Sequence, residues 1–165
     1  MLENVSMFDL TNTTKGKLPR LPFLVIKDDI LGADYDLSIA FVSGKKSHEI
    51  NLAHRGKDKM TNVLSFTLNK KKGEIILCPS LIKKESLDPE KNFGKNFPNL
   101  LLFLVIHGML HLKGMEHSSR MERAEKIFFE KYQNKHNEKH FNRNRHGHDN
   151  HPSSGGRIHQ RRKKS

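Results

Sequence analysis

The chain has 165 residues, a length that suits a single domain with its own hydrophobic core. Its formal net charge is +12, while its apolar content of 35% and mean hydropathy of −0.70 are low for a compact domain. Its single cysteine, Cys78, excludes a secreted scaffold built on internal disulfides, and its longest apolar run, residues 100–106, is too short to span a bilayer.

Hydrophobic periodicity predicts mixed helices and strands in the first half of the chain. The pattern allows a short strand near residues 2–5. After this segment we expect a helix over 21–31, a strand over 36–42, a short helix over 47–53, and a hairpin of strands 61–68 and 74–78 joined by a five-residue loop. Between residues 80 and 97 the mixed signals predict a loop interrupted by a short helix.

The second half is expected to be helical. Residues 98–112 are almost wholly apolar and begin at Pro98, which predicts a buried helix. Ser119 and Glu122 form a capping box, and an apolar stripe then continues to about Tyr132. We therefore predict an α+β fold with a small mixed sheet of hairpin-linked strands packed on helices, one of them buried and carrying a metal-ligand pair.

Residues 133–165 differ in composition from the rest. They hold nine lysine or arginine residues, two acids and only two large apolar residues, Phe141 and Ile158. Such a segment cannot bury enough surface to offset its ordering entropy, so we predict a domain over 1–132 and a disordered basic tail over 133–165. The six histidines of this tail can bind metal loosely, but the run Arg161–Lys164 favours a cationic arm that binds phosphate groups directly.

Positive charge on both parts of the chain favours a polyanionic partner. The tail carries +7 and the body +5, a distribution that suits nucleic acid, where counterion release drives binding without sequence choice. The alternative partner is an anionic membrane surface, but no amphipathic lysine-rich helix or lipidation motif supports it. Because the N-terminus has no long apolar region typical of a signal peptide, we expect a cytoplasmic protein.

Three histidines carry the most chemical information. His107 and His111 are four residues apart, so on a helix they lie on the same face. A straight helix would rotate His117 away from them, but Gly114 can adopt a positive φ, end the helix and turn the chain back. A histidine on an apolar helix is more often a hydrogen-bonded core residue, yet two buried imidazoles need partners, which one Zn²⁺ per chain would supply.

Three neutral imidazoles around Zn²⁺ leave the fourth tetrahedral position for water, as in a catalytic site. The histidine spacing is that of the metzincin proteases, in which the residue after the first histidine is the general-base glutamate. Here that residue is Gly108, which argues against a metalloprotease. Glu116 adjoins the third histidine, and we expect it to orient one of the rings.

Two separated blocks of residues resemble one family. The block His107-Gly-x-Leu-His111-Leu-x-Gly114-x-x-His117 is similar to the zinc motif of the YbeY family, bacterial endoribonucleases of ribosomal RNA maturation. The block Arg55-Gly-Lys-Asp-Lys-Met-Thr-Asn-Val-Leu-Ser-Phe66 resembles a second motif of that family, and Gly73-Glu-Ile75 resembles its strand start. The resemblance covers about residues 37–132.

The resemblance implies both a site and a reaction. It implies that His107, His111 and His117 bind Zn²⁺ and that Arg55 is a functional arginine that faces the metal cleft. It further implies a single-strand-specific endoribonuclease that acts in 16S rRNA 3′-end maturation and ribosome quality control, with RNA of the small subunit, and in addition ribosome-associated proteins, as partners. Without the flanking block, Arg55 would be interpreted as a solvated loop charge.

The chain departs from the family pattern at three positions. Glu116 and Glu74 each replace an aspartate, and Asn62 replaces the aspartate of the second block, which removes a charge. Asn62 motivates an alternative function, a non-catalytic ribosome-assembly factor in which zinc only stabilises an RNA-binding fold. The charged segment 57–59 is either an exposed turn or a phosphate contact. Thr61 and Ser65 are expected to serve packing and hydrogen bonding rather than catalysis, and Cys78 to be a buried apolar residue.

Overall fold

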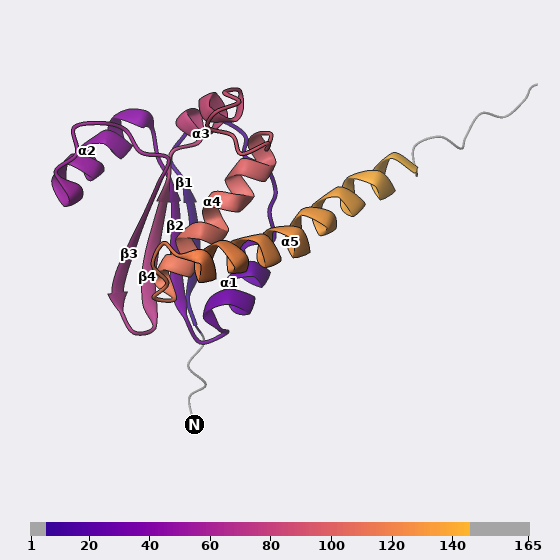
Figure 1. Ribbon diagram of the computed structural model, residues 1–165, viewed down its shortest axis with the longest axis horizontal. Helices are drawn as coiled ribbons and strands as arrows, with labels where there is room; N and C mark the ends of the chain where they lie inside the picture. Colours follow the sequence, from indigo (N-terminus) through magenta and orange to yellow (C-terminus); the bar gives the residue numbers. More distant parts are fainter. Residues whose placement is uncertain (1–5, 146–165) are drawn as a thin grey trace, which may run out of the picture.

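The computed structural model describes residues 6–145, with side chains described only up to residue 133. Along the chain it has these elements: β1 (Phe8–Asn12), α1 (Phe23–Leu31), β2 (Asp36–Phe41), α2 (Gly44–Arg55), β3 (Val63–Asn69), β4 (Lys72–Leu77), α3 (Pro79–Ser86), α4 (Phe97–Leu112) and α5 (Ser119–Arg145). Figure 1 shows α4 crossing the middle of the molecule and α5 extending away from it. The predicted α+β class is confirmed.

The four strands form one mixed sheet in the order β1-β2-β4-β3. β1, β2 and β4 run parallel, and β3 pairs with β4 antiparallel, so β3 is an edge strand. The predicted hairpin is present, but its loop is shorter than the expected five residues. β3 ends at Asn69 and β4 begins at Lys72, because the register shift between Thr67 and Asn69 lets the ladder continue to the turn.

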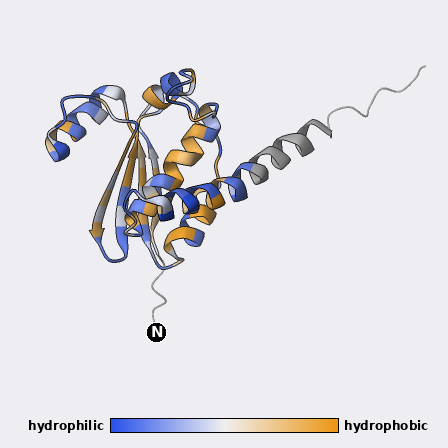
Figure 2. Ribbon diagram, in the orientation of Figure 1, coloured by the Kyte–Doolittle hydropathy of each residue, from blue (hydrophilic) through white to orange (hydrophobic). Residues whose placement is uncertain are grey.

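The main core lies between one face of the sheet and α1, α4 and α5. Strand residues alternate between the two faces, so Leu37, Ile39, Phe41, Ile75 and Leu77 all point to the same side, where they are at most 2% exposed. α4 completes this core, since ten of its residues are buried and Figure 2 shows it apolar along its length. On the other face a smaller cluster of Val42, Leu64 and Ile76 packs against α2.

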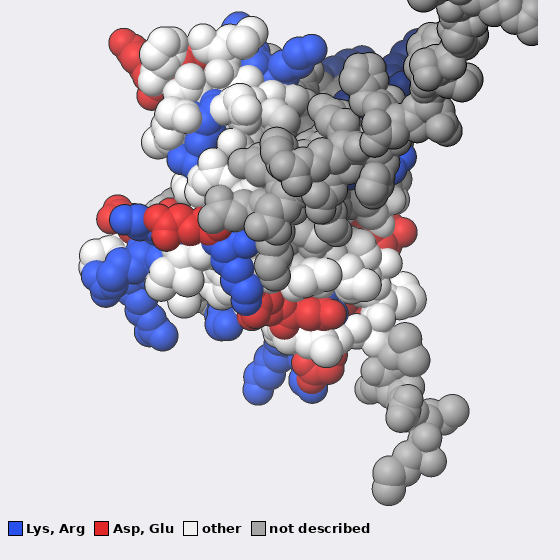
Figure 3. Space-filling view, turned by 90° about the vertical axis from the view of Figure 1, so that its right-hand side faces the viewer, with Lys and Arg blue, Asp and Glu red and all other residues white. Residues whose placement is uncertain are grey.

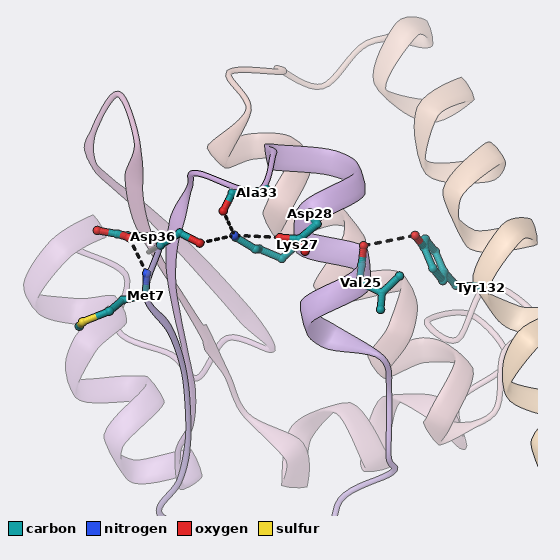
Figure 4. A network of polar contacts seen from close by, with 8 residues as sticks. Met7, Val25, Lys27, Asp28, Ala33, Asp36 and Tyr132 are labelled. Carbon is teal, nitrogen blue, oxygen red and sulfur yellow. Dashed lines mark hydrogen bonds and ion pairs between the residues drawn. The ribbon is translucent and has the colours of Figure 1, made fainter. Parts of the chain in front are cut away.

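α1 is fixed to its neighbours by polar contacts. The fully buried Lys27 ammonium donates to the Ala33 carbonyl and to the Asp28 carboxylate, both at 2.9 Å, so this buried charge is paired and hydrogen-bonded (Figure 4). The Tyr132 hydroxyl of α5 donates to Asp29 Oδ2 at 2.9 Å, and burial together with this contact raises the pKa of Tyr132 to about 12. α5 is thereby anchored to α1.

Several predicted boundaries differ from those observed. The strand expected near residues 2–5 lies outside the described residues, and β1, which was not predicted, has only one side chain packed on the core. The cap of α5 is Ser118 rather than Ser119, since the Ser118 hydroxyl accepts from the Met121 amide at 3.4 Å.

The predicted end of the last helix near Tyr132 is wrong. α5 continues to Arg145, because the chain has no glycine or proline between Gly114 and Gly147 to interrupt a helix. The segment expected to be a disordered tail therefore falls partly within α5, while residues 146–165 lie outside the described residues. The domain boundary at residue 132 stays a prediction.

Candidate metal centre

His107 and His111 both project from the C-terminal half of α4. This helix begins at the cap Asn96, whose side chain accepts from the Asn99 amide, and Pro98 occupies its first turn. The spacing of four residues places the two imidazoles one above the other, with ring centroids 4.5 Å apart. Their Nε2 atoms lie 3.0 Å from each other.

The turn after α4 brings the third histidine to this pair. Gly114 has φ +91°, and its amide donates to the His111 carbonyl at 2.9 Å, while the Met115 amide donates to the Leu110 carbonyl at 3.0 Å. The ring centroid of His117 then lies 5.2 Å from that of His107 and 4.7 Å from that of His111. One nitrogen of each ring lies within 4.8 Å of the other two, so the three residues form a group that could hold a metal ion.

In two of the three rings, Nδ1 already has a hydrogen-bond partner. His107 Nδ1 lies 2.6 Å from Glu125 Oε1, and His111 Nδ1 lies 2.9 Å from the Met115 carbonyl oxygen. A carbonyl and a carboxylate only accept, so we assign a proton to each of these Nδ1 atoms. A neutral imidazole has a single N–H, which leaves each Nε2 atom with a lone pair.

Whether the site fits a metal ion can be judged from these two lone pairs. Two Nε2 lone pairs that face each other at 3.0 Å repel unless a cation lies between them. Two nitrogens bound to one tetrahedral Zn²⁺ at about 2.0–2.1 Å lie about 3.3 Å apart, close to the observed separation. The donor set therefore fits a metal ion that takes imidazole ligands.

Burial favours the metal-binding form of His111. Its pKa is lowered from the ordinary value chiefly by burial and further by the neighbouring His107 and His117, while the Met115 carbonyl acts in the opposite direction. A lower histidine pKa keeps the ring neutral, and only the neutral ring can bind a metal. His117, by contrast, is exposed, so the group is open to solvent on that side.

Glu125 was missed by the sequence interpretation, which expected Glu116 to orient a ring. Glu116 is exposed, and the contact described for it is its backbone carbonyl, which accepts from Ser118. The Glu125 side chain is only 12% exposed and comes from α5, eighteen residues after the ring that it contacts. The sequence did contain a signal for Glu125. An acid on the inward side of the apolar stripe of α5 is buried, and a buried carboxylate needs a hydrogen-bond partner.

The structure places Arg55 at the end of α2, whereas the histidines lie on α4 and in the turn that follows it. Arg55 is the exposed last residue of α2, and none of the hydrogen bonds or ion pairs of the described residues joins it to the metal group. The ring of the preceding His54 packs against that of Phe66 of β3, with ring centroids 5.0 Å apart and an interplanar angle of 56°. The end of α2 is thereby held beside β3, whose Ser65 faces α4 from the opposite side of the sheet.

Gly108 provides the close contact between α4 and the sheet. A Cβ atom at this position would lie 3.0 Å from Ser65 Oγ and 3.1 Å from a methyl group of Ile75, tighter than almost all real contacts. Any larger side chain after the first histidine would therefore require Ser65 or Ile75 to shift by a few tenths of an ångström. Ser65 thus serves packing, as expected.

The hydrogen bonds of the other residues singled out in the sequence are with partners other than these three histidines. The side-chain amide of Asn62 donates to Glu85 of α3 at 2.9 Å, so the residue that replaces the family aspartate has a carboxylate partner. In the exposed segment 57–59, Asp58 Oδ1 lies 2.6 Å from His48 Nε2. The Thr61 amide donates to the Ser47 hydroxyl of α2 at 3.1 Å and the Thr61 hydroxyl donates to the Val63 carbonyl at 3.2 Å, while Cys78 is buried, both as expected.

One face of the body carries charges of both signs. On the face shown in Figure 3, lysine and arginine side chains alternate with acidic ones. Within the part of the chain that the structure describes, no helix combines the length and apolarity needed to cross a membrane.

Comparison with known proteins places the chain in a family. A protein from Lactobacillus gasseri named Endoribonuclease YbeY is 35% identical over 100 residues, which cover 50% of this chain and 55% of that relative. A protein of the same name from Staphylococcus carnosus is 32% identical over 111 residues, 60% of this chain and 70% of the relative. The solution structure of a Thermotoga maritima protein, 26% identical, superposes with a TM-score of 0.60 over 90% of this chain and 100% of that chain. A family model described as endoribonuclease YbeY matches residues 19–140, and the chain therefore belongs to the YbeY family.

Proposed function

We propose that this protein is a zinc-dependent endoribonuclease that cuts single-stranded RNA. One observation carries the proposal: in a member of this family, two imidazole Nε2 atoms lie 3.0 Å apart beside a third, exposed histidine. Family membership supports the prediction of a hydrolase that acts on RNA. Three nitrogen donors favour Zn²⁺, and one ion per chain would leave one tetrahedral position open.

The chain's own residues would hold the ligands in place. Glu125 accepts from His107 Nδ1 and the Met115 carbonyl accepts from His111 Nδ1, so both rings present Nε2 inward. The carboxylate of Glu125 also makes the His107 ring a stronger donor to a cation. A bound Zn²⁺ supplies a Lewis acid for phosphodiester hydrolysis. The exposed side at His117 gives a phosphate access to the centre.

Arg55 is proposed to stabilise the charge that develops on the phosphate. A guanidinium is always protonated and forms two parallel hydrogen bonds with phosphate oxygens. It stabilises the transition state most, because the negative charge on these oxygens is greatest there. Support comes from the exposure of Arg55 and from the contact between His54 and Phe66, which keeps the end of α2 beside an edge strand that packs on α4. An RNA strand bound across β3 would reach both Arg55 and the metal group.

The geometry argues against peptide hydrolysis. A metalloprotease needs a carboxylate beside the open metal position. Glu125 contacts His107 Nδ1 rather than the side of the ring that carries Nε2, and Gly108 has no side chain that could supply a carboxylate. Neither residue can therefore act as the general base of a zinc protease.

The finer substrate assignment follows from the family resemblance. We propose that the RNA is the 3′ end of 16S rRNA in the small ribosomal subunit, that cleavage serves rRNA maturation and ribosome quality control, and that the protein acts in the cytoplasm. The net charge of +12 supports a polyanionic partner.

The decisive experiment compares three full-length proteins loaded with zinc: wild type, His111→Ala and His48→Ala. His48 is a matched control, because it is a histidine outside the metal group and its variant keeps the tail and any metal bound there. We expect wild type and His48→Ala to cleave single-stranded RNA and His111→Ala to lose at least about 100-fold in rate. Equal cleavage by all three would refute the proposal.

The assembly-factor alternative is separated by Arg55→Ala. A nuclease should retain its zinc content and lose about 10²–10³-fold in cleavage rate, as when a transition-state donor is removed. A wild-type protein that binds RNA and zinc but cleaves nothing would support the non-catalytic function. Asn62 no longer motivates that function, since its partner is Glu85 of α3.

A further inference from the structure

A row of aromatic rings leads from the surface to the metal group. The ring centroids of Phe93 and Phe103 lie 5.8 Å apart with an interplanar angle of 39°, and those of Phe103 and His107 lie 6.2 Å apart at 33°. Phe129 of α5 packs edge-on against Phe103 at 6.3 Å. The outermost ring, Phe93, is therefore two steps from a proposed metal ligand.

Phe93 is held in an unfavourable position. It is 68% exposed, and its φ of +51° is a backbone conformation that bulky residues rarely adopt. The turn that imposes this conformation is hydrogen-bonded, since the Gly94 amide donates to the Asn92 side chain and the Lys95 amide to the Asn92 carbonyl, both at 2.8 Å. Single exposed apolar residues are common, but strain of this kind is concentrated at functional sites.

Lys95 places a positive charge over the same rings. Its Nζ atom lies 4.8 Å from the ring centroid of Phe103, 5.0 Å from that of Phe129 and 5.8 Å from that of Phe93, and it donates to the Phe93 carbonyl at 3.1 Å. Within the described residues no carboxylate forms an ion pair with it. Burial lowers the pKa of Lys95 and the charge of nearby Glu125 opposes this, so Lys95 lies within electrostatic range of the carboxylate that contacts His107.

We infer that Phe93 and Lys95 form a nucleotide-binding subsite beside the metal centre, in which an unpaired base stacks on the Phe93 ring and the adjoining phosphate binds the Lys95 ammonium. The inference rests on the proposed endoribonuclease function and names how its substrate is held. It also gives a physical reason for single-strand preference, because a base can stack on a side chain only when it is not stacked within a duplex.

An RNA strand fits this surface better than an apolar partner would. Every base has a π-face that can extend a row of rings, and a cation without a carboxylate partner attracts phosphate. A purely apolar ligand would bury the Lys95 ammonium without an ion-paired carboxylate, which costs free energy.

Fluorescence can test the subsite without any cleavage, because the chain contains no tryptophan. Phe93→Trp places a single tryptophan at the proposed stacking position. Ile127→Trp is the matched control, since Ile127 is 63% exposed and lies two residues, roughly 200° around α5, from both Glu125 and Phe129. Each full-length variant is titrated with an oligouridylate of about eight nucleotides in excess EDTA. We expect saturable quenching of the tryptophan at position 93 only.

Affinity measurements then separate stacking from charge. Phe93→Ala should bind the same oligonucleotide roughly 5- to 100-fold more weakly, and Phe93→Tyr should bind it normally. Lys95→Gln should weaken binding and reduce the slope of log affinity against log salt by about 0.7, and Lys95→Arg should restore both. Equal quenching of the two tryptophan variants, or unchanged affinity in Phe93→Ala, would overturn the subsite.

The two proposals fail in different ways. If wild type cleaves RNA and Phe93→Ala binds and cleaves it equally well, the subsite is wrong and the nuclease function stands. If Phe93→Trp is quenched selectively but zinc-loaded wild type cleaves no RNA, the subsite stands as a binding site and the nuclease function is wrong.

Discussion

The two faces of the sheet are built differently. One face is covered by α1, α4 and α5 over a continuous apolar core, and the histidine group lies on the helix that completes this core. The other face has only the small cluster of Val42, Leu64 and Ile76 under α2 and a groove of about 490 Å³ between α2 and the hairpin. In Figure 1, α2 accordingly stands apart from the other helices.

The difference shows where precise geometry can be maintained. Metal ligands must keep their positions to within a few tenths of an ångström, and close-packed surroundings on the α4 face resist displacement. Arg55, on the thinly covered face, is exposed and free of such packing. A residue that only has to reach a bound phosphate tolerates more motion than a metal ligand.

The largest expected effect comes from two adjacent residues of β4 that point to opposite faces. Ile75 is fully buried in the main core and Ile76 is 8% exposed in the small cluster. Ile75→Ala should lower the free energy of unfolding by about 4 kcal/mol and Ile76→Ala by about 2 kcal/mol, because a less closely packed site relaxes around the cavity. Urea denaturation in EDTA measures both without a metal contribution.

The same pair also affects the metal. Ile75 contacts the backbone of α4 at Gly108, so Ile75→Ala should weaken zinc binding, whereas Ile76→Ala should leave it unchanged. Equal losses of stability and zinc affinity in the two variants would mean that the faces contribute alike, contrary to this comparison.

A smaller effect is expected from the carboxylate that holds His107. Glu125→Gln should reduce zinc affinity by about 10- to 100-fold, because the ring loses its charged partner. The matched variant Glu116→Gln, beside His117 in sequence but exposed, should bind zinc as wild type does. Competition with a chromophoric chelator gives both affinities, and the reverse ranking would support the role expected for Glu116 from sequence.

Local sequence was sufficient for much of the site. The spacing of His107 and His111 determines that they share a helix face, and Gly114 marks the turn that returns His117. The apolar stretch of α4 and the alternation in β2 predicted both elements within a few residues. These features depend on neighbours in the chain, so their periodicity is visible in the sequence.

Features that depend on distant parts of the chain were not predictable in this way. Glu125 contacts His107 only because α5 packs across α4, and β1 forms only because β2 offers it a partner. The bulge near Leu68, which shortens the hairpin loop, arises from pairing with β4. The position of Phe93 beside Phe103 likewise requires the loop before α4 to fold back on that helix.

The smallest expected effect concerns the turn that joins the covered face to the third histidine. At Gly114 a Cβ atom would meet nothing within 4 Å, so Gly114→Ala tests the backbone conformation alone. A φ of +91° is costly for alanine, and the metal-free variant should be about 1–2 kcal/mol less stable and bind zinc more weakly, because relaxing the turn moves His117. Gly16→Ala is the control, with equal space and no positive φ, and should change stability by less than about 0.5 kcal/mol. If both variants bind zinc equally well, the returning turn does not set the position of His117, and the group must be assembled by the metal rather than by the fold.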